Sequence, residues 1–293
     1  MSLRALVDAD ITPVAVLTQP DRPAGRGRRI TASPVKQLAE AAGIAVLQPE
    51  TLRDDSVISE LAGLEPDMLI VAAYGLILPQ AVLDIPGSGC LNVHASLLPR
   101  WRGAAPIQAA IKAGDAQTGV CLMAMTAGLD CGPVYVSESM AVGADETAGE
   151  LHDRIAAAGG RLLIRHLGDI IAGNISPQEQ DESAATYAPK ILASDAVIDW
   201  QRSATELDRI VRAFNPTPGA YFLFDDERIK CSGASIAAGS GALPGTVIDA
   251  GPDGIIVACG DGALCMTSLQ RPGKRLVSAG EFAAQLDIVG RHL

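Results

Sequence analysis

The chain has 293 residues, of which 48% are hydrophobic and 19% charged, and this balance excludes an intrinsically disordered protein. The net charge of −11 disfavours sequence-independent nucleic-acid binding, although a local basic patch could still bind one. The length predicts two domains. No apolar run reaches the roughly 20 residues that span a membrane, and the N-terminus has no secretory-signal pattern. The six cysteines form no CxxC pair, so we expect reduced, mostly buried thiols in a cytoplasmic protein.

The first two-thirds of the chain alternates short apolar runs with helical stretches. The apolar runs are typical of strands buried on both faces, and we expect them at 12–17, 44–47, 68–72, 90–94, 119–125 and 134–136. Helices are expected at 2–9, 34–42, 104–113 and 147–171. Gly159 and Gly160 are expected to bend the last of these helices. The alternation predicts an α/β domain over residues 1–173, with a doubly wound, mostly parallel sheet.

A polar stretch with prolines near both ends, residues 174–192, interrupts this pattern and indicates a linker. A helix is expected after it at 205–214, where Pro216 and Pro218 stop it. Short strands separated by Gly and Asp turns follow at 221–224, 228–231, 245–248, 255–258 and 263–269. Their spacing predicts a small β-barrel as the second domain, residues 193–293.

The candidate catalytic residues lie at the ends of two expected strands. Asn92 and His94 are two residues apart on one strand, so they point to the same side of it. An amide beside an imidazole can bind a carbonyl oxygen and stabilise the charge that develops on it. Asp130, in the glycine-rich loop 128–133, could orient the histidine or move protons. The alternatives are a structural histidine at a strand end and an aspartate that only shapes a turn.

A second group of candidates is basic. Five basic residues and one acid lie between Pro20 and Lys36, within an acidic chain. Arginines between glycines can reach phosphates, although a solvated basic loop is the alternative. The loop contains four of them: Arg22, Arg26, Arg28 and Arg29. Positive charge and a stacking surface are also expected after His94, at Arg100, Trp101 and Arg102.

These segments together resemble the methionyl-tRNA formyltransferases. The likeness is carried by CLNVHASLLPRWRGAAPIQ at 90–108, GLDCGP at 128–133 and QPDRPAGRGRR at 19–29, and it extends over essentially the whole chain. HASLLP alone is shared by the wider family that uses 10-formyltetrahydrofolate, which includes the glycinamide ribonucleotide and sugar-nucleotide formyltransferases. RWRGAAPIQ and the arginine-rich loop are more specific to the tRNA branch.

The resemblance implies transfer of a formyl group from 10-formyltetrahydrofolate to the methionine of initiator methionyl-tRNA, without a metal. Asn92, His94 and Asp130 match the family's catalytic residues. Asn92 and protonated His94 would stabilise a tetrahedral oxyanion, while Asp130 would hold His94 charged and relay the proton of the amine. The folate-binding segment matches Ser96, Leu97, Leu98 and Pro99. The tRNA acceptor stem would meet Arg26, assisted by Arg22, Arg28 and Arg29.

The family pattern begins with a strand and a loop ahead of the first helix expected here. We therefore expect a start assigned too far downstream, with a deliberate truncation or a natural variant as the alternatives. We also expect a sheet without its central strand, and a chain that folds poorly or is weakly active. The C-terminal part resembles an OB-like barrel. Because this part has nine basic and twelve acidic residues, only a local cluster could face tRNA, and its candidates are Arg271, Lys274 and Arg275.

Two other functions remain open alongside this one, and we expect a monomer in each case. A formyltransferase for a sugar-nucleotide amine would use Asn92, His94 and Asp130 without needing Arg26. A tRNA-binding protein without catalysis would follow if the N-terminal departure abolished turnover. A nicotinamide dehydrogenase is disfavoured, because no GxGxxG motif follows an early strand.

Overall fold

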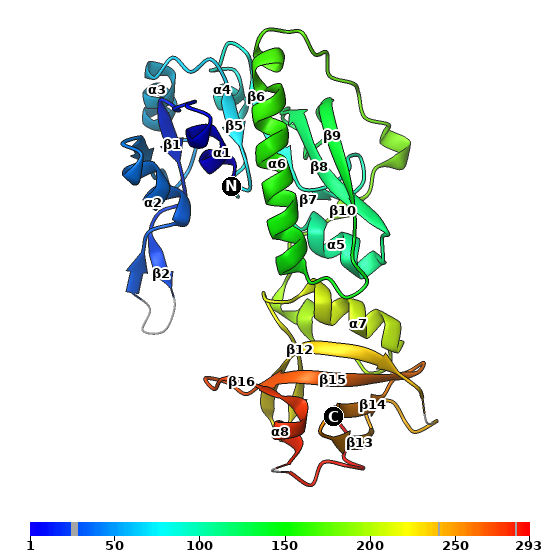
Figure 1. Ribbon diagram of the computed structural model, residues 1–293. Helices are drawn as coiled ribbons and strands as arrows, with labels where there is room; N and C mark the ends of the chain where they lie inside the picture. The colour runs from blue at the N-terminus through cyan, green and yellow to red at the C-terminus, as the bar shows by residue number, and fades with distance from the viewer. Residues whose placement is uncertain (25–28, 240, 285) are drawn as a thin grey trace. The chain divides into compact units, whose positions relative to one another are not determined.

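The computed structural model describes residues 1–24, 29–239, 241–284 and 286–293. The chain divides into two compact units, each described here by itself (Figure 1). Unit 1 comprises Met1–Pro106, Thr118–Met140 and Asp153–Ala188, and unit 2 comprises Ile107–Gln117, Ala141–His152 and Pro189–Leu293. The helix α6 (Ala148–Ile171) contributes residues to both units.

The other elements of unit 1 are α1 (Ser2–Asp8), β1 (Ala15–Leu17), β2 (Arg22–Ala24), β3 (Arg29–Thr31), α2 (Pro34–Ala41), β4 (Ala45–Leu47), α3 (Asp55–Gly63), β5 (Leu69–Val71), α4 (Gln80–Leu83), β6 (Cys90–His94), β7 (Arg102–Gly103), β8 (Gln117–Ala124), β9 (Val134–Ala141) and β10 (Tyr187–Ala188). Unit 2 contains most of α5 (Pro106–Ala113), together with α7 (Ala204–Ala213), β11 (Ala220–Phe224), β12 (Glu227–Ala237), β13 (Val247–Gly251), β14 (Gly254–Ala258), β15 (Ala263–Gln270), β16 (Leu276–Ser278) and α8 (Ala279–Ala283).

The main strands of unit 1 form two ladders. One joins β1 and β4 in parallel, and the other has the order β5-β6-β8-β9. Within the second ladder β5 and β6 are parallel, whereas β6 and β8 are antiparallel. The α/β class is confirmed, but the sheet is mixed rather than mostly parallel. The chain leaves β6 at His94 and enters β8 at the same end of the sheet, where Cys121 pairs with His94, so β8 runs antiparallel to β6.

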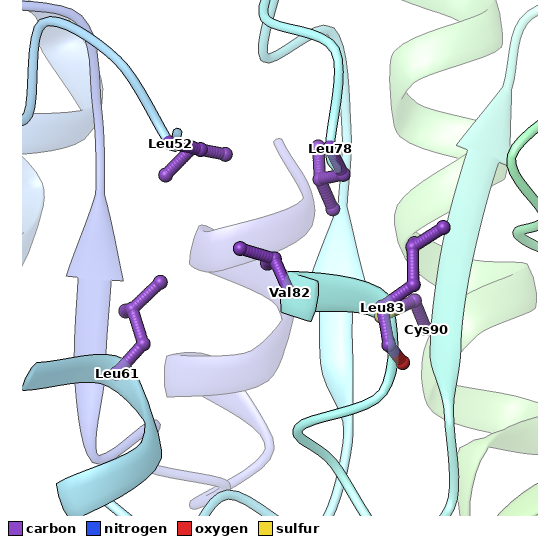
Figure 2. Packing of buried hydrophobic residues seen from close by; sticks show 6 residues of the cluster. All are labelled: Leu52, Leu61, Leu78, Val82, Leu83 and Cys90. Atoms are coloured by element: carbon purple, nitrogen blue, oxygen red, sulfur yellow. The ribbon is translucent and has the colours of Figure 1, made fainter. Parts of the chain in front are cut away.

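The two ladders share an apolar core. Six buried side chains form a cluster around α4 and the ends of β5 and β6, shown in Figure 2: Leu52, Leu61, Leu78, Val82, Leu83 and Cys90. Leu17 of β1 and Leu47 of β4 pack against this cluster, as does Val71 of β5. Side chains from both ladders thus pack against one hydrophobic cluster, whose burial is the main stabilising contribution there.

The helix α6 is continuous from Ala148 to Ile171, so the expected bend at its two glycines is absent. A Cβ atom on Gly159 would lie 2.8 Å from Val93 Cγ1, and one on Gly160 would lie 3.1 Å from Ala5 Cβ. These glycines therefore allow α6 to approach β6 and α1 closely. The two glycines in the sequence therefore indicate close packing of the helix against its neighbours rather than a kink.

Unit 2 contains an antiparallel sheet of order β11-β12-β15-β14-β13, with β16 added on β15. The described strands form an open ladder consistent with a small barrel-like domain. The expected helix at 205–214 is confirmed as α7, whose buried face includes Leu207, Ile210 and Val211. A reciprocal capping box between Ser203 and Glu206 fixes its N-terminal end.

Residues 178–188, which we call the strap, lie in the stretch expected to be a linker. Their backbone is attached to unit 1 at both ends: Gln178 pairs with Val134, and β10 pairs in parallel with β7. The strap is therefore part of the packing of unit 1, and the polar composition of this stretch reflects hydrogen bonding to that unit rather than simple solvation.

Candidate active site

Asn92, His94 and Asp130 come together although 36 residues or more separate the aspartate from the other two. β6 places Asn92 and His94, and the loop after β8 brings Asp130 to them. Asn92 Nδ2 lies 3.4 Å from Asp130 Oδ1, and His94 Nδ1 lies 3.8 Å from the same oxygen. The amide, the imidazole and the carboxylate thus surround one point, as charge stabilisation with proton transfer requires.

The two nitrogens of the His94 ring face different partners. Its Nε2 lies 3.2 Å from the backbone oxygen of Trp101, and a carbonyl oxygen can only accept, so Nε2 carries the hydrogen in this contact. Its Nδ1 faces Asp130 at 3.8 Å, which is longer than a direct hydrogen bond. The ring is only 6% exposed. Nδ1 is consequently aimed at the carboxylate without being bonded to it.

A backbone amide that sequence reasoning missed also holds Asp130. The N–H of Gly103 donates to Asp130 Oδ2 at 2.8 Å, while Asn92 Nδ2 donates to Oδ1. Asp130 itself has a φ of +48°, which turns its side chain back toward β6. The two donors bind different oxygens of one carboxylate and so fix its orientation. Gly103 is the last residue of the RWRG sequence, and no local pattern there indicates a hydrogen bond to a residue 27 positions away.

The segment expected to bind folate begins with a side chain that is fully buried. Ser96 Oγ donates to the backbone oxygen of Arg100 at 2.6 Å, so its hydroxyl closes the turn after β6. Leu97, Leu98 and Pro99 are half-buried. Gly119 makes room for Leu97, since a Cβ there would lie 2.6 Å from Leu97 Cδ2. The accessible part of this segment is therefore an apolar edge next to His94.

The expected tRNA-binding loop begins in the antiparallel hairpin β2–β3. Arg22 is exposed there and donates to Gln19 Oε1. Arg26 and Arg28 lie outside the described residues, as does the side chain of Arg29. At the base of the hairpin, Lys36 Nζ lies 2.8 Å from Asp21 Oδ2, and hydrogen bonds from Lys36 and then Gln48 lower the pKa of Asp21.

The expectation that Arg102 adds accessible positive charge is wrong. Its side chain is fully buried, and its guanidinium makes a bidentate pair with Glu182 at 2.7 and 2.9 Å. This hydrogen bonding raises the pKa of Arg102 and lowers that of Glu182. Arg100 does reach the surface, and its guanidinium carbon lies 4.3 Å from the Trp101 ring centroid. In unit 2, Arg271 and Arg275 form ion pairs with Glu227 and Glu281.

Among the described residues, no cluster of three or more His, Cys, Asp or Glu could hold a metal ion. Burial raises the pKa of Cys90, Cys121 and Cys259 to about 11, and that of Cys231 to about 12. No helix within the described ranges is long and apolar enough to cross a membrane.

Two family profiles match the chain in sequence. The profile described as formyl transferase matches residues 4–167, and the one described as formyl transferase, C-terminal domain, matches residues 190–287. The chain belongs to the formyl transferase family. Among its curated relatives, a methionyl-tRNA formyltransferase from Pseudomonas fluorescens strain Pf-5 is 54% identical over 280 residues, which cover 96% of this chain and 88% of that protein. Within the family, the chain is therefore closely similar to enzymes that act on methionyl-tRNA.

Solved structures with lower identity share the fold. An N-formyltransferase from Helicobacter canadensis, in complex with folinic acid and dTDP-3-aminofucose, aligns with a TM-score of 0.65 at 15% identity, covering 92% of this chain and 94% of that one. HypX from Aquifex aeolicus, in complex with tetrahydrofolic acid, aligns with a TM-score of 0.63 at 19% identity, covering 86% of this chain and 44% of that one. Both were solved with a folate bound.

Proposed function

We propose that this chain formylates the methionine of initiator methionyl-tRNA, with 10-formyltetrahydrofolate as the donor of the formyl group. The family assignment makes it a formyl-transferring enzyme, and the identity of 54% to a methionyl-tRNA formyltransferase supports the acceptor. One observation in the structure carries the proposal: Asn92 Nδ2 and His94 Nδ1 both face the same carboxylate oxygen, Oδ1 of Asp130. One chain supplies all three groups, which supports a monomer, and an aminoacyl-tRNA acceptor implies a cytoplasmic enzyme.

In this proposal Asn92 is the main donor to the formyl oxygen. The Nδ2 group has two hydrogens, and the contact with Asp130 Oδ1 uses one of them. The other remains for the oxygen on which negative charge develops as the amine attacks. Loss of one such donor lowers kcat by about 100- to 1,000-fold in related chemistry.

His94 and Asp130 would move the proton. With Nε2 bonded to Trp101 O, the ring presents Nδ1 toward the reacting centre and Asp130 Oδ1. An imidazolium at His94 would stabilise the oxyanion, and the carboxylate would accept a proton from the attacking amine and pass it toward the departing nitrogen. General acid–base catalysis of this kind contributes about 100- to 10,000-fold.

Substrate binding would be divided between two parts of unit 1. Leu97, Leu98 and Pro99 offer an apolar edge beside the catalytic residues, which suits the flat pterin of a folate, while the buried Ser96 hydroxyl maintains the turn. The arginine-rich loop would bind the phosphates of the acceptor stem, with Arg26 as the main contact and Arg22, Arg28 and Arg29 beside it. The folate supplies the activated formyl group, and neither binding step calls for a metal ion.

The test is formyl transfer from 10-formyltetrahydrofolate to methionine-charged initiator tRNA, compared with a sugar-nucleotide amine as acceptor. We expect turnover with the tRNA alone, and a kcat at least 100-fold lower for Asp130→Asn, which keeps the shape of the side chain and removes its charge. Transfer to the sugar-nucleotide amine with none to the tRNA would overturn the acceptor. tRNA binding without any turnover would overturn the enzymatic assignment.

A further inference from the structure

The strap, residues 178–188, contacts both groups that hold the His94 ring. Its side chains come from the polar stretch that the sequence presents as a linker, and they reach two places in the site. One is the loop of Asp130, and the other is the backbone of Trp101, whose oxygen accepts from His94 Nε2. Both places lie in unit 1, so the contacts belong to one compact body.

Gln180 holds the Asp130 loop. Its Nε2 donates to two backbone oxygens of that loop, Asp130 O at 2.9 Å and Gly132 O at 2.7 Å. An amide that bridges both carbonyls uses its two hydrogens and fixes the intervening turn. Asp130 has a φ of +48°, an uncommon conformation for a residue with a side chain, although aspartate adopts it more readily than most. Gln180 thus holds the backbone on both sides of Cys131 while Asp130 has this conformation.

Arg102 in turn holds Gln180. Its Nε and Nη2 both donate to Gln180 Oε1, at 3.0 and 2.9 Å, and its remaining donors reach both carboxylate oxygens of Glu182. The guanidinium is fully buried, whereas the Glu182 side chain is 70% exposed. With its oxygen bound in this way, the Gln180 amide cannot flip, and its NH₂ group is kept facing the Asp130 loop.

Thr186 holds the other partner of His94. Its Oγ1 accepts from the backbone N–H of Trp101 at 2.9 Å, and its backbone oxygen accepts from the N–H of Arg102. The Trp101 peptide therefore has its N–H tied to the strap while the oxygen of the same residue accepts from His94 Nε2. Trp101 has a φ of +63°, which again needs an external constraint.

We propose that Gln180 and Thr186 are positioning residues for catalysis, acting through Asp130 and Trp101 to fix the His94 ring, with Arg102 and Glu182 holding Gln180 in place. The proposal rests on the catalytic roles given to Asn92, His94 and Asp130 above. Displacement of a catalytic group by about 1 Å costs on the order of 100-fold in rate, so loss of either contact is expected to act mainly on kcat.

The first experiment compares Gln180→Leu with Gln178→Leu in formyl transfer to methionyl-tRNA. Gln178 is an exposed residue of the same strap whose backbone pairs with Val134, and it serves as the matched control. We expect Gln180→Leu to lower kcat by about 10- to 100-fold with the KM values for folate and tRNA within about threefold. Gln178→Leu is expected to retain wild-type kcat. Equal kcat values for the two variants would overturn the role of Gln180.

A double-mutant cycle separates positioning from a general loss of folding. If Gln180 acts through Asp130, adding Gln180→Leu to Asp130→Asn lowers kcat less than about threefold further, because the group being positioned has already lost its function. A purely structural Gln180 would multiply the two losses. If Asp130→Asn itself leaves kcat unchanged, the proposed catalytic roles fail, which is distinct from failure of the strap proposal.

Thr186 allows a conservative rescue. Thr186→Val keeps the shape but removes the acceptor for the Trp101 N–H, and it is expected to lower kcat while the KM values for folate and tRNA stay within about threefold. Thr186→Ser restores the hydroxyl and is expected to recover at least half of the wild-type kcat. A Thr186→Ser variant as slow as Thr186→Val would show that packing rather than the hydroxyl matters, and would overturn this part of the proposal.

Discussion

The backbone N–H of Gly103 donates to Asp130 Oδ2 at 2.8 Å, so a two-residue strand supports the carboxylate from the side opposite Asn92. Gly103 can do this because it has no side chain. Its φ is +116°, and a Cβ atom there would lie 2.6 Å from the backbone oxygen of Ala188. The same residue thus joins the strap to the candidate catalytic aspartate.

Gly103→Ala is expected to lower both stability and activity. Backbone strain alone costs about 1–3 kcal/mol, and the contact with Ala188 adds to it and displaces the amide from Asp130. Gly43→Ala is the matched control, because Gly43 also has a positive φ of +70° but nothing within 4 Å of the added atom. Urea unfolding and kcat are the measurements. A Gly103→Ala enzyme with wild-type kcat per folded molecule would contradict the support of Asp130.

Two glycines of α6 are expected to respond in opposite directions to alanine. Gly159→Ala places a methyl group 2.8 Å from Val93 Cγ1, and overpacking of this kind costs about 1–3 kcal/mol. Gly168→Ala meets nothing within 4 Å and replaces a poor helix former, so it is expected to gain about 0.5–1 kcal/mol. Urea unfolding of the two variants measures both. The same sign for both would contradict close packing of α6 on β6.

The capping box of α7 makes the stability of unit 2 sensitive to acid. Hydrogen bonds from the backbone and then the hydroxyl of Ser203 lower the pKa of Glu206 below its ordinary 4.5. A carboxylate with a lowered pKa in the folded state stabilises above its unfolded pKa, and this contribution is lost as the pH falls through the folded value. Wild type is therefore expected to exceed Glu206→Gln in urea midpoint at pH 7, and the difference to shrink below about pH 4. A difference independent of pH would contradict the assignment.

Arg26→Ala is expected to weaken tRNA binding without slowing the chemical step. A phosphate contact contributes through released counterions, so losing one should reduce the slope of log K against log salt by about 0.7–0.9. The kcat at saturating tRNA is expected to stay within about threefold of wild type. Arg165→Ala, which removes an exposed arginine from α6, is the control and should change neither quantity. An unchanged KM for tRNA in Arg26→Ala would remove this loop from the proposed interface.

Local sequence patterns predicted much of the fold and part of the candidate site. The apolar runs predicted six strands of unit 1, of which β6 and β8 are largely buried, whereas β4, β5 and β9 are only partly buried. Alternation along β6 predicted that Asn92 and His94 share one side, since period 2 is a property of the strand itself. The helix α7 was similarly predicted by a local pattern, the spacing of its apolar residues.

The remaining features depend on partners distant in the sequence. Arg102 was expected at the surface because charged side chains are seldom fully buried, and nothing near it indicates that Gln180 and Glu182 would surround it. The same holds for Gly103, whose hydrogen bond to Asp130 spans 27 residues. Gly159 was expected to bend α6, because a helix glycine in isolation does not reveal whether another side chain packs against it.

The chain's two tryptophans fall one in each unit, and this provides two separate optical signals. Trp101 follows the segment proposed to bind folate, lies next to the Arg100 guanidinium, and has a backbone oxygen 3.2 Å from His94 Nε2. Trp200 is buried in unit 2, with its ring centroid 6.0 Å from that of Phe222. In a Trp101→Phe variant the remaining fluorescence reports the unfolding of unit 2 alone, and in Trp200→Phe it reports events beside the candidate catalytic residues. The two variants can therefore distinguish the unfolding of one unit from that of the other without an added fluorescent label.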